Sequence, residues 1–566
     1  MIEINSLTRT FSGEMILDGI NLNIEKGSFT AILGRNGSGK STLAKHLNAI
    51  LIPEDGDVFV DGINTKNEQK IFDVRERVGM VFQNPESQAV ASIVEDDTAF
   101  APENLGLSED EILRRVEYAL DAAGISHLRH RAISTLSGGQ KQLAAVAGIL
   151  AMRPEYMVFD EGTSMLDPLA RKRIIDCVMR LKNEFGISII WITHYMEEAA
   201  AADRVIVLDN GHITADGTPA EIFSDYELIS HSGLDIPQCT RLCLMLRKSG
   251  LHIPYIASDI NTCAKQIAKS VNGKFSPSEI FRETKPQYRI SLKNISYSYS
   301  SPAGRTDAVS HITEDISTGI TAVIGRTGSG KSTLAEIIAG ITEPDSGFVT
   351  LDDRPLKECA KEIGMVFQNP EYQLFAETVY EDIAYGPKNL GMTGKALDAR
   401  VKEAAELTGL TQKQLEAAPY ELSGGQKRLA ALAGILAMEP SVLVLDEPAA
   451  GLDPIGRQHI FSILNKLKQA RHNMTIIFVT HSMEDAAQYA DDIMVLCNGS
   501  AAAHGTPHEI FTNEKLLAEC GLDSPEMAKL SSALRSFGAD IGTALTVQEA
   551  HNAVMSIAKG GSGDAS

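Results

Sequence analysis

Short apolar runs alternate with longer segments of helical periodicity along the whole chain. Residues 28–33, 156–159 and 187–192 are largely apolar runs of strand length, as expected for strands that are buried on both faces. Strands that alternate with helices in this way form a parallel sheet covered by helices. The segments at residues 2–8 and 58–61 have the pattern of an antiparallel flank. The predicted fold class is α/β.

The motifs of the first half return in the second half in the same order. Residues 34–42, Gly-Arg-Asn-Gly-Ser-Gly-Lys-Ser-Thr, return as Gly-Arg-Thr-Gly-Ser-Gly-Lys-Ser-Thr at residues 325–333. Four shorter motifs do the same: Met-Val-Phe-Gln-Asn-Pro-Glu at 80–86 and 365–371, Leu-Ser-Gly-Gly-Gln-Lys at 136–141 and 422–427, Asp-Glu at 160–161 and 446–447, and Thr-His at 193–194 and 480–481. Ordered repeats of this kind indicate a duplicated domain.

The repeats define the expected domain boundaries. We expect domains at residues 1–224 and 288–514, a linker or small helical appendage at 225–287, and a helical appendage with a flexible tail at 515–566. Helix-rich sequence between the glutamine and serine-glycine motifs of each copy predicts an inserted helical subdomain.

Composition places the chain among globular proteins. Of 566 residues, 43% are hydrophobic and 22% are charged, which excludes wholesale disorder and coiled-coil repetition. The net charge of −22 argues against a nucleic-acid partner. No apolar stretch approaches the roughly 18 to 20 residues that span a bilayer, and no secretory signal opens the chain, so a cytoplasmic location is expected.

The seven cysteines are scattered and odd in number, which favours reduced thiols over a disulfide framework. Cys239 and Cys243 have the i,i+4 spacing of a metal-binding pair. Since no second pair lies nearby, buried thiols are the favoured interpretation.

The glycine loops predict phosphate binding. In this motif backbone N–H groups surround phosphate oxygens at the positive end of the following helix. Lys40 and Lys331 would neutralise the β and γ phosphates, and Ser41 and Ser332 would offer a hydroxyl to Mg²⁺.

Two carboxylates follow a buried strand in each copy. An isolated acidic pair at a strand end is usually solvated, but a phosphate loop upstream favours a catalytic role. Asp160 then anchors Mg²⁺, Glu161 polarises the attacking water and His194 hydrogen-bonds the γ-phosphate. Their counterparts in the second copy are Asp446, Glu447 and His481.

The Leu-Ser-Gly-Gly-Gln motif offers a hydroxyl and close backbone approach at a helix start, as a second phosphate grip. With the other motifs it resembles the ATP-binding-cassette (ABC) ATPases over residues 1–223 and 288–512. The resemblance implies two tandem P-loop NTPase domains, each with a RecA-like parallel core, an antiparallel flank and a helical subdomain.

In that family the serine-glycine grip of one domain faces the glycine loop of the other, so two composite ATP sites are implied. The first joins Gly37, Lys40, Ser41, Thr42, Gln83, Asp160, Glu161 and His194 to Ser423, Gly425 and Asp453. The second joins Gly328, Lys331, Ser332, Thr333, Gln368, Asp446, Glu447 and His481 to Ser137, Gly139 and Asp167. Further implied nucleotide-binding positions are Gly34, Asn36, Ser38, Gly39, Gly138, Gln140, Gly325, Thr327, Ser329, Gly330, Gly424 and Gln426. The implied Mg²⁺ ligands are Ser41, Gln83 and Asp160, with Ser332, Gln368 and Asp446.

Phe11 and Tyr299 occupy the place where the family stacks an aromatic ring on adenine. Simple packing of the strands is the alternative for each of them.

The residues around the glutamine motifs narrow the resemblance. Phe-Gln-Asn-Pro-Glu-Ser-Gln at 82–88 and Phe-Gln-Asn-Pro-Glu-Tyr-Gln at 367–373 are similar to the energy-coupling-factor (ECF) importers, including their cobalt and nickel branch. Residues 160–168 resemble one of that group's two ATPases, and residues 446–454 resemble the other. The chain thus resembles both ATPases fused.

That resemblance implies partners and a location. The ATPase pair would energise import of a vitamin or transition metal ion from the cytoplasmic face of the membrane. It would bind a membrane scaffold (T component) that works with a substrate-capture protein (S component), and it would not touch the substrate. Acids after the glutamine motifs suit a cationic scaffold or are simply a solvated helix face: Glu95, Asp96 and Asp97, with Glu377, Glu381 and Asp382.

Four residues depart from the pattern of relatives. They are Ala101, Leu143, Leu429 and Ala449.

The alternatives in function are an ATPase for an unrelated permease and a soluble tandem-cassette translation factor. The iron–sulfur recycling type would need a cysteine cluster near the start, which the sequence lacks.

Overall fold

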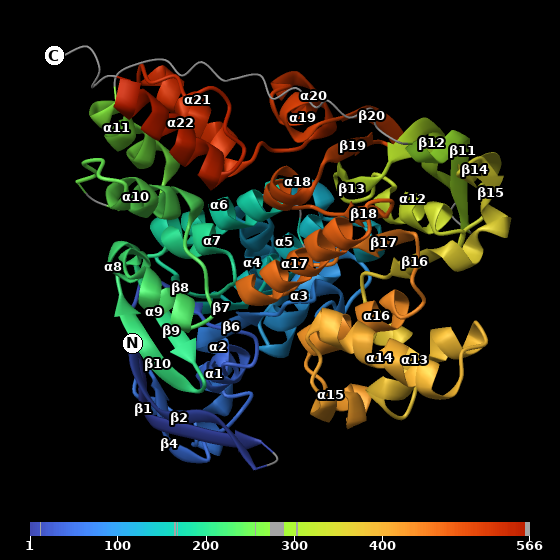
Figure 1. Cartoon of the computed structure of the whole chain (residues 1–566). Coiled ribbons are helices and arrows are strands. Elements are labelled where there is room, and N and C mark those ends of the chain that lie inside the picture. The colour runs from blue at the N-terminus through green and yellow to red at the C-terminus, as the bar shows by residue number, and fades with distance from the viewer. Residues whose placement is uncertain are drawn as a thin grey trace. The chain divides into compact units, whose positions relative to one another are not determined.

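Two sheets and a set of covering helices make up each half of the molecule. The computed structural model describes residues 1–11, 13–163, 166, 168–254, 256–271, 288–301 and 304–560. The chain divides into two units, Met1–Ser270 and Val271–Ser566, which we call lobe 1 and lobe 2. The lobes share one architecture (Figure 1).

A six-stranded sheet forms the centre of lobe 1, in the order β10-β9-β3-β8-β7-β6. Its strands are β3 Phe29–Leu33, β6 Val78–Val81, β7 Tyr156–Asp160, β8 Ser188–Ile192, β9 Arg204–Asp209 and β10 His212–Gly217. All neighbours are parallel except β9 and β10. The three apolar runs of the sequence are β3, β7 and β8, and the predicted parallel core is confirmed.

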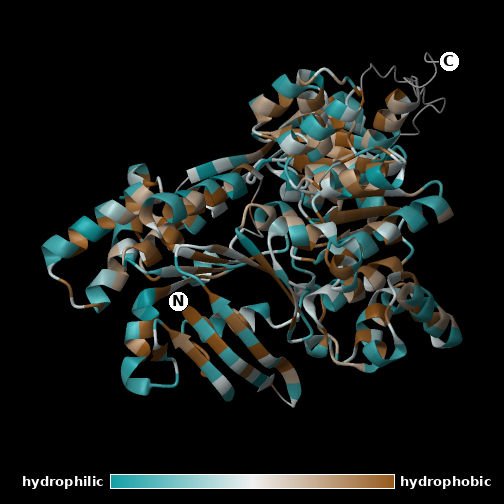
Figure 2. Ribbon diagram, turned by 90° about the vertical axis from the view of Figure 1, so that its left-hand side faces the viewer, coloured by the Kyte–Doolittle hydropathy of each residue, from teal (hydrophilic) through white to brown (hydrophobic). Residues whose placement is uncertain are grey.

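A second, antiparallel sheet flanks this core in the order β2-β1-β4-β5. Its strands are β1 Ile2–Phe11, β2 Glu14–Ile24, β4 Asp55–Val60 and β5 Ile63–Asn64. Hydrophobic and hydrophilic residues alternate along strands near the N-terminus (Figure 2), as expected for a sheet with one buried face. The predicted antiparallel flank is confirmed.

The helices of lobe 1 cover both sheets and form the inserted subdomain. They are α1 Lys40–Leu47, α2 Ile71–Arg77, α3 Val94–Asn104, α4 Glu109–Ala122, α5 Gly138–Leu150, α6 Pro168–Phe185, α7 Met196–Ala200, α8 Pro219–Ser224, α9 Tyr226–His231, α10 Gln238–Lys248 and α11 Ile260–Ser270. Helices α3, α4 and α5 pack together as the predicted helical subdomain.

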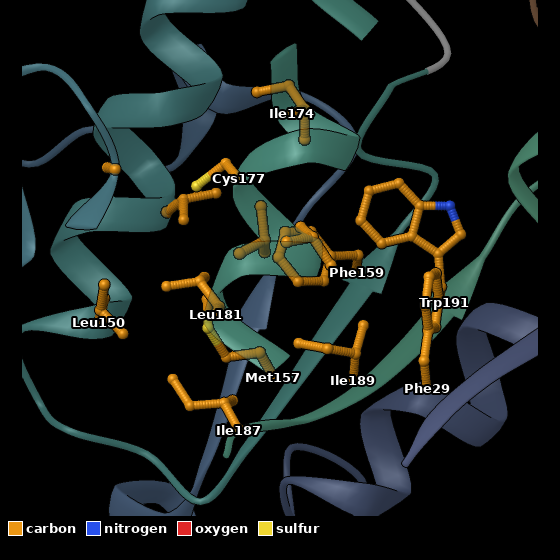
Figure 3. Close-up of a cluster of buried hydrophobic side chains, with 14 of the residues drawn as sticks. Phe29, Leu150, Met157, Phe159, Ile174, Cys177, Leu181, Ile187, Ile189 and Trp191 are labelled. Carbon is orange, nitrogen blue, oxygen red and sulfur yellow. The ribbon is translucent and has the colours of Figure 1, made fainter. Parts of the chain in front are cut away.

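Aromatic side chains fill the core between the parallel sheet and α6. Trp191 packs against Phe29 and Phe159, with ring centroids 6.1 and 4.7 Å away (Figure 3). Buried aromatic groups of this size contribute strongly to the stability of a lobe. Phe159 and Trp191 belong to β7 and β8, two neighbouring strands of the parallel sheet.

Lobe 2 repeats these layers. Its parallel core has the order β16-β17-β18-β13-β19-β20, with β13 Gly319–Gly325, β16 Ile363–Val366, β17 Val442–Asp446, β18 Thr475–Val479, β19 Asp492–Cys497 and an antiparallel β20 Ser500–Gly505. Its flank has the order β12-β11-β14-β15, with β11 Tyr288–Ser301, β12 Gly304–Ser317, β14 Ser346–Leu351 and β15 Arg354–Pro355. Its helices are α12 Lys331–Ile338, α13 Val379–Asn389, α14 Gly394–Thr408, α15 Gln412–Glu416, α16 Gly424–Leu436, α17 Pro454–Ala470, α18 Met483–Tyr489, α19 Pro507–Phe511, α20 Glu514–Cys520, α21 Glu526–Ser536 and α22 Val547–Gly560.

Helices also occupy the two segments that follow the cassettes. Helices α10 and α11 belong to lobe 1, while α21 and α22 belong to lobe 2. Part of the predicted linker, 272–287, and the end of the predicted tail, 561–566, lie outside the described residues. Among the described helices, none combines the length and apolar character needed to cross a bilayer.

Candidate functional site: two nucleotide centres

A glycine-rich loop joins the central strand to the first helix of each lobe, β3 to α1 and β13 to α12. Gly37 and Gly39 have φ values of 83° and 101°, in the left-handed region that favours glycine. A Cβ on Gly39 would lie 2.8 Å from the carbonyl oxygen of Ile16. The loop therefore approaches the flanking sheet closely and turns its backbone into the concave form that binds phosphate. In lobe 2, Gly328 and Gly330 have φ values of 80° and 93°.

The loop lysine of each lobe is buried and held by its own loop. Lys40 is 4% exposed and donates hydrogen bonds of 2.9 Å from Nζ to the carbonyls of Gly34 and Arg35. Lys331 makes the same 2.9 Å contacts with Gly325 and Arg326. A buried ammonium fixed in this way is preorganised to receive an anion.

Buried polar atoms beside these loops fit a nucleotide and a metal ion. The hydroxyl oxygens of Ser38 and Ser329 and Oδ1 of Asp446 are buried without a hydrogen-bond partner in the described part of the chain. Groups of this kind are costly unless a ligand satisfies them. Phosphate oxygens accept from hydroxyls, and Mg²⁺ binds carboxylate and hydroxyl oxygens, so this donor set fits the predicted ATP and Mg²⁺.

The predicted metal-binding residues come together at the ends of β7 and β17. Ser41 donates a 2.8 Å hydrogen bond from Oγ to Oδ1 of Asp160. Burial raises the pKa of the Asp160 carboxyl, and the Ser41 hydrogen bond opposes this only in part. Burial raises the pKa of Asp446 as well. A divalent cation beside these oxygens would favour their ionised form.

Gln83 and Gln368 contact the predicted catalytic glutamate of their own lobe. Gln83 donates from Nε2 to Oε2 of Glu161 at 3.1 Å, and Gln368 does the same to Glu447. The predicted metal contact of these amides stays a prediction.

Each predicted catalytic glutamate lies against the predicted histidine. The distance from Nε2 of His194 to Oε1 of Glu161 is 2.6 Å, and that from His481 to Glu447 is 2.5 Å. Burial alone would raise the pKa of Glu161, but the His194 hydrogen bond and the nearby charges lower it below its usual value. The pKa of Glu447 is lowered for the same reasons, against the same effect of burial. Both glutamates are thus held ionised and able to accept a proton.

The backbone of these glutamates is strained. Glu161 and Glu447 have φ values of 51° and 50°, a region that costs a non-glycine residue about 1–2 kcal/mol. Their N–H groups donate to Ile192 and Val479 at 3.1 Å, which ties this conformation to the strand that precedes each histidine. These hydrogen bonds hold each glutamate in its strained conformation at the end of the sheet.

The serine-glycine motifs start long helices. Ser137 caps α5 and forms a capping box with Gln140, and Ser423 does the same for α16 with Gln426. Both serines are exposed. The motif glycines are Gly138 and Gly139, with Gly424 and Gly425, and they form the first turn, where unpaired N–H groups favour an anion.

The remaining predicted nucleotide contacts differ in their environment. Asp453 caps α17 by accepting a 2.8 Å hydrogen bond from the N–H of Gly456, and Asp167 lies outside the described residues. Phe11 is partly exposed and has the Arg9 guanidinium 4.7 Å from its ring centre. Tyr299 is partly exposed too, and its hydroxyl lies 3.1 Å from that of Thr333 in the first turn of α12. Asn36, Thr42 and Thr327 lie in the same two loops and helix starts.

Several of the acids expected to meet a cationic partner are engaged within their own subdomain. Asp97 accepts hydrogen bonds from the N–H groups of Val90 and Ala91, at 2.7 and 2.9 Å. Asp382 does the same for its own preceding loop at 3.0 Å, and Glu95 pairs with Arg129. Asp96, Glu377 and Glu381 are exposed.

Sequence reasoning missed the residues that hold the loops directly after Glu161 and Glu447. Glu198 is 1% exposed and accepts hydrogen bonds from the hydroxyls of Thr163 and Thr193 in the first lobe. In the second lobe, Arg428 donates hydrogen bonds to three backbone carbonyls. The signals in the sequence were the differences between corresponding positions of the two copies, such as Thr163 against Ala449 and Gln142 against Arg428. The predicted buried thiols Cys239 and Cys243 are indeed buried.

Comparisons with known proteins identify the family of the chain. The model of the family described as "ABC transporter" matches residues 17–164 and 310–450. A putative ABC transporter ATP-binding protein of Methanosarcina mazei is 35% identical over 565 residues, covering 95% of this chain and 94% of that protein. The energy-coupling factor transporter ATP-binding protein EcfA1 of Clostridium novyi is 52% identical over 254 residues, covering 45% of this chain and 90% of that protein. The solved structure of cbiO1 from Clostridium perfringens, titled as part of the ABC transporter complex cbiONQ, is 38% identical over 41% of this chain and 93% of its own, with a TM-score of 0.38.

The two matched segments contain both glycine loops, both serine-glycine motifs and both predicted catalytic glutamates. The matched relative from M. mazei spans almost the whole chain, so the tandem arrangement is shared with it. The chain therefore belongs to the ABC transporter family, as an ATPase with two ATP-binding cassettes whose hydrolysis of ATP is coupled to transport.

Proposed function

We propose that this chain is the ATPase subunit of an ECF-type importer and that both of its centres hydrolyse ATP. The observation that carries the proposal is the duplicate pair of histidine and glutamate, 2.6 and 2.5 Å apart, beside a complete glycine loop in each lobe. The 52% identity to EcfA1 supports the importer class.

Each centre would divide the work of hydrolysis among its own residues. Lys40 and the loop N–H groups bind the β and γ phosphates, and Ser41, Asp160 and Gln83 hold Mg²⁺. The ion, when bound, neutralises charge on the phosphate oxygens. Glu161 accepts a proton from the attacking water. At the same time the water oxygen forms a bond to the γ-phosphorus, and the bond between that phosphorus and the bridging oxygen of the β-phosphate breaks. The products are ADP and phosphate. His194 orients Glu161 and reaches the γ-phosphate. Lys331, Ser332, Asp446, Gln368, Glu447 and His481 take the same roles in lobe 2.

Replacing the glutamates tests this assignment. We expect Glu161→Gln and Glu447→Gln each to remove one centre, and the double variant to lower ATP turnover by about 10²–10⁴-fold, the usual contribution of a general base. Bound ATP should persist in each variant. Glu184→Gln, on an exposed position of α6, is the matched control. Unchanged turnover in both single variants and in the double variant would refute the catalytic assignment.

We further propose that each centre is completed by the other lobe. Ser423, Gly425 and Asp453 would close the centre of Glu161, and Ser137, Gly139 and Asp167 that of Glu447. The exposed serines at two helix starts support a second phosphate grip.

Double variants separate this pairing from a self-contained centre. Ser423→Arg should add little to Glu161→Gln, because both would silence the same centre, while Ser137→Arg combined with Glu161→Gln should abolish turnover. The opposite pattern would show that each lobe uses its own serine.

A membrane scaffold is the proposed partner, at the cytoplasmic face, with a separate capture protein for a vitamin or metal ion. The exposed acids Asp96, Glu377 and Glu381 suit a cationic scaffold, since opposite charges steer docking. ATP binding and hydrolysis would close and reopen the lobes and move the glutamine motifs against the scaffold.

Purification in mild detergent tests the partner. A hydrophobic scaffold protein should copurify with the chain, and Glu377→Lys combined with Glu381→Lys should release it without changing the ATPase rate of the isolated chain. Recovery of ribosomes in place of the scaffold would contradict the transport function.

A further inference from the structure

The loops that follow the two catalytic glutamates are held by different residues. We call residues 161–163 of lobe 1 and 447–450 of lobe 2 the glutamate loops. Since Glu161 and Glu447 have the same strained φ and the same histidine contact, the two loops carry the same chemistry. Their supports, however, come from opposite sides of the centre.

In lobe 1 the support is the carboxylate of Glu198, at the start of α7. It is 1% exposed and accepts a 2.7 Å hydrogen bond at Oε1 from the hydroxyl of Thr163, two residues after the catalytic glutamate. Its Oε2 accepts from the hydroxyl of Thr193 at 2.5 Å and from Nε1 of Trp191 at 2.8 Å. Thr193 directly precedes the catalytic histidine. One buried carboxylate therefore joins the glutamate loop to the histidine loop.

Lobe 2 cannot form this bridge. Ala449 stands where lobe 1 has Thr163, and it has no hydroxyl to donate. The carboxylate at the place of Glu198 is the shorter Asp485, which pairs with Arg457 at 2.7 Å, while the corresponding Arg171 of lobe 1 lies farther from Glu198, at 3.6 Å. Arg457 also donates to the hydroxyl of Ser482 at 2.6 Å.

The glutamate loop of lobe 2 is held by Arg428 of α16. Its guanidinium donates to the carbonyls of Pro448, at 3.3 Å, and of Ala450. It donates as well to the carbonyl of Gln368, at 3.2 Å. The planar fork of arginine suits several acceptors at once. This loop is therefore joined to the glutamine motif and to the helix that begins at Ser423.

Lobe 1 has the uncharged Gln142 at the place of Arg428. Its amide donates to the carbonyl of Phe82 at 3.4 Å, and the described residues of the glutamate loop give it no hydrogen bond. Each lobe thus has one support that the other lacks: Glu198 holds the loop of lobe 1, and Arg428 holds the loop of lobe 2.

We propose that Glu198, through Thr163, and Arg428 are positioning residues, each for the catalytic glutamate of its own lobe. Glu161 is positioned from the histidine side of its centre, and Glu447 is positioned from α16 and the glutamine motif. Both glutamates accept a hydrogen bond from the glutamine of their own lobe, but only the loop of Glu447 is also joined to α16, whereas the loop of Glu161 is joined to the histidine loop through Glu198. This proposal rests on the proposed function of the two glutamates.

Substitutions that copy one lobe into the other test the proposal in the full chain. Glu447→Gln leaves chemistry only at Glu161, and Glu161→Gln leaves it only at Glu447. In the Glu447→Gln background, Thr163→Ala should lower kcat about tenfold and keep the KM for ATP within about twofold, because misplacing a catalytic group affects the reaction more than binding. In the Glu161→Gln background the same substitution should change neither constant. Arg428→Gln should show the reverse pattern.

Conservative variants separate positioning from damage to the fold. Thr163→Ser keeps the hydroxyl and should restore kcat, while Thr163→Val keeps the volume and should not. Arg428→Lys keeps the charge but lacks the fork, so it should recover only part of the rate. The thermal unfolding curve should show every variant folded at the assay temperature, although the loss of a buried hydrogen bond lowers the midpoint.

Two results would overturn the proposal, and they are distinguishable. If Glu161→Gln and Glu447→Gln leave hydrolysis intact, the proposed catalytic centres are wrong, and the proposed positioning roles are wrong as well. If these two variants act as expected but Thr163→Ala and Arg428→Gln act equally in both backgrounds, or change KM alone, only the positioning roles are wrong.

Discussion

The two lobes have the same residues at their predicted nucleotide centres and different residues around them. The lysine contacts, the glycine torsions and the distance between histidine and glutamate agree closely between lobes. The groups around them do not: Thr163 and Gln142 of lobe 1 correspond to Ala449 and Arg428 of lobe 2. The comparison indicates that the chemistry constrains the atoms that touch ATP, while the surrounding contacts are free to connect each centre to a different part of its lobe.

The largest expected effect tests the similarity of the lobes. Lys40→Ala and Lys331→Ala each remove a buried cation from a phosphate site, a change that costs about 2–5 kcal/mol when the partner charge is left unpaired. We expect each variant to lose one of two ATP-binding events in calorimetric titration, with the affinity at that site lower by roughly 10²–10³-fold.

Lys172→Ala, on an exposed position of α6, is the control and should retain both events. Loss of both events in Lys40→Ala alone would show that the lobes do not bind nucleotide independently.

The next prediction concerns an aspartate that has different partners in the two lobes. Asp61 of lobe 1 is hydrogen-bonded by Lys26 and Tyr156 and by the chain's amino group, while its counterpart Asp352 in lobe 2 pairs with Arg289. Burial would raise the pKa of Asp61, but these hydrogen bonds lower it from 3.8 to about 2. A depressed pKa stabilises the fold above pH 3.8, and this contribution is lost as the pH falls towards 2.

Asp61→Asn should therefore lower the free energy of unfolding of lobe 1 by about 2 kcal/mol at neutral pH, and the difference from the parent chain should disappear near pH 2. Urea unfolding followed by the fluorescence of Trp191, the one tryptophan of the sequence, measures lobe 1 separately. Asp352→Asn should leave that transition unchanged. A constant difference across the pH range would assign the effect to packing.

The parts of this structure that the sequence predicts are those with local signals. The runs that became β3, β7 and β8 are apolar because both faces of these strands are buried, and the glycine loop has its own turn chemistry. The positive φ of Glu161 depends on its bond to Ile192, and the support by Glu198 depends on residues from three separate segments. Asp97 shows that even a contact six or seven residues away can lack a sequence signal, because its bonds to Val90 and Ala91 depend on how the intervening loop folds back. Contacts between distant segments have no signature in a single sequence.

A smaller effect concerns the acid limb of the pH profile. His194 lowers the pKa of Glu161 against the effect of burial, so His194→Gln should raise that pKa. The glutamate would then be protonated at a higher pH, and the acid limb of kcat in the Glu447→Gln background should move upward. His481→Gln in the Glu161→Gln background should do the same for Glu447. The measurement is kcat across the acid pH range. If the acid limb is unchanged in both histidine variants, a group other than these glutamates determines it.

The smallest expected effect is optical and distinguishes the lobes. Trp191 donates from Nε1 to Glu198, whose carboxylate also binds the loops of the catalytic glutamate and histidine of lobe 1. Nucleotide that shifts either loop changes the field at the indole, so ATP should produce a small change in the emission of Trp191. The change should survive Lys331→Ala and vanish in Lys40→Ala. Thr163→Ala should reduce it, because the carboxylate then loses its bond to the glutamate loop. A response that follows the lysine of lobe 2 instead would mean that the indole senses lobe 2, and the separation of the two supports would then be wrong.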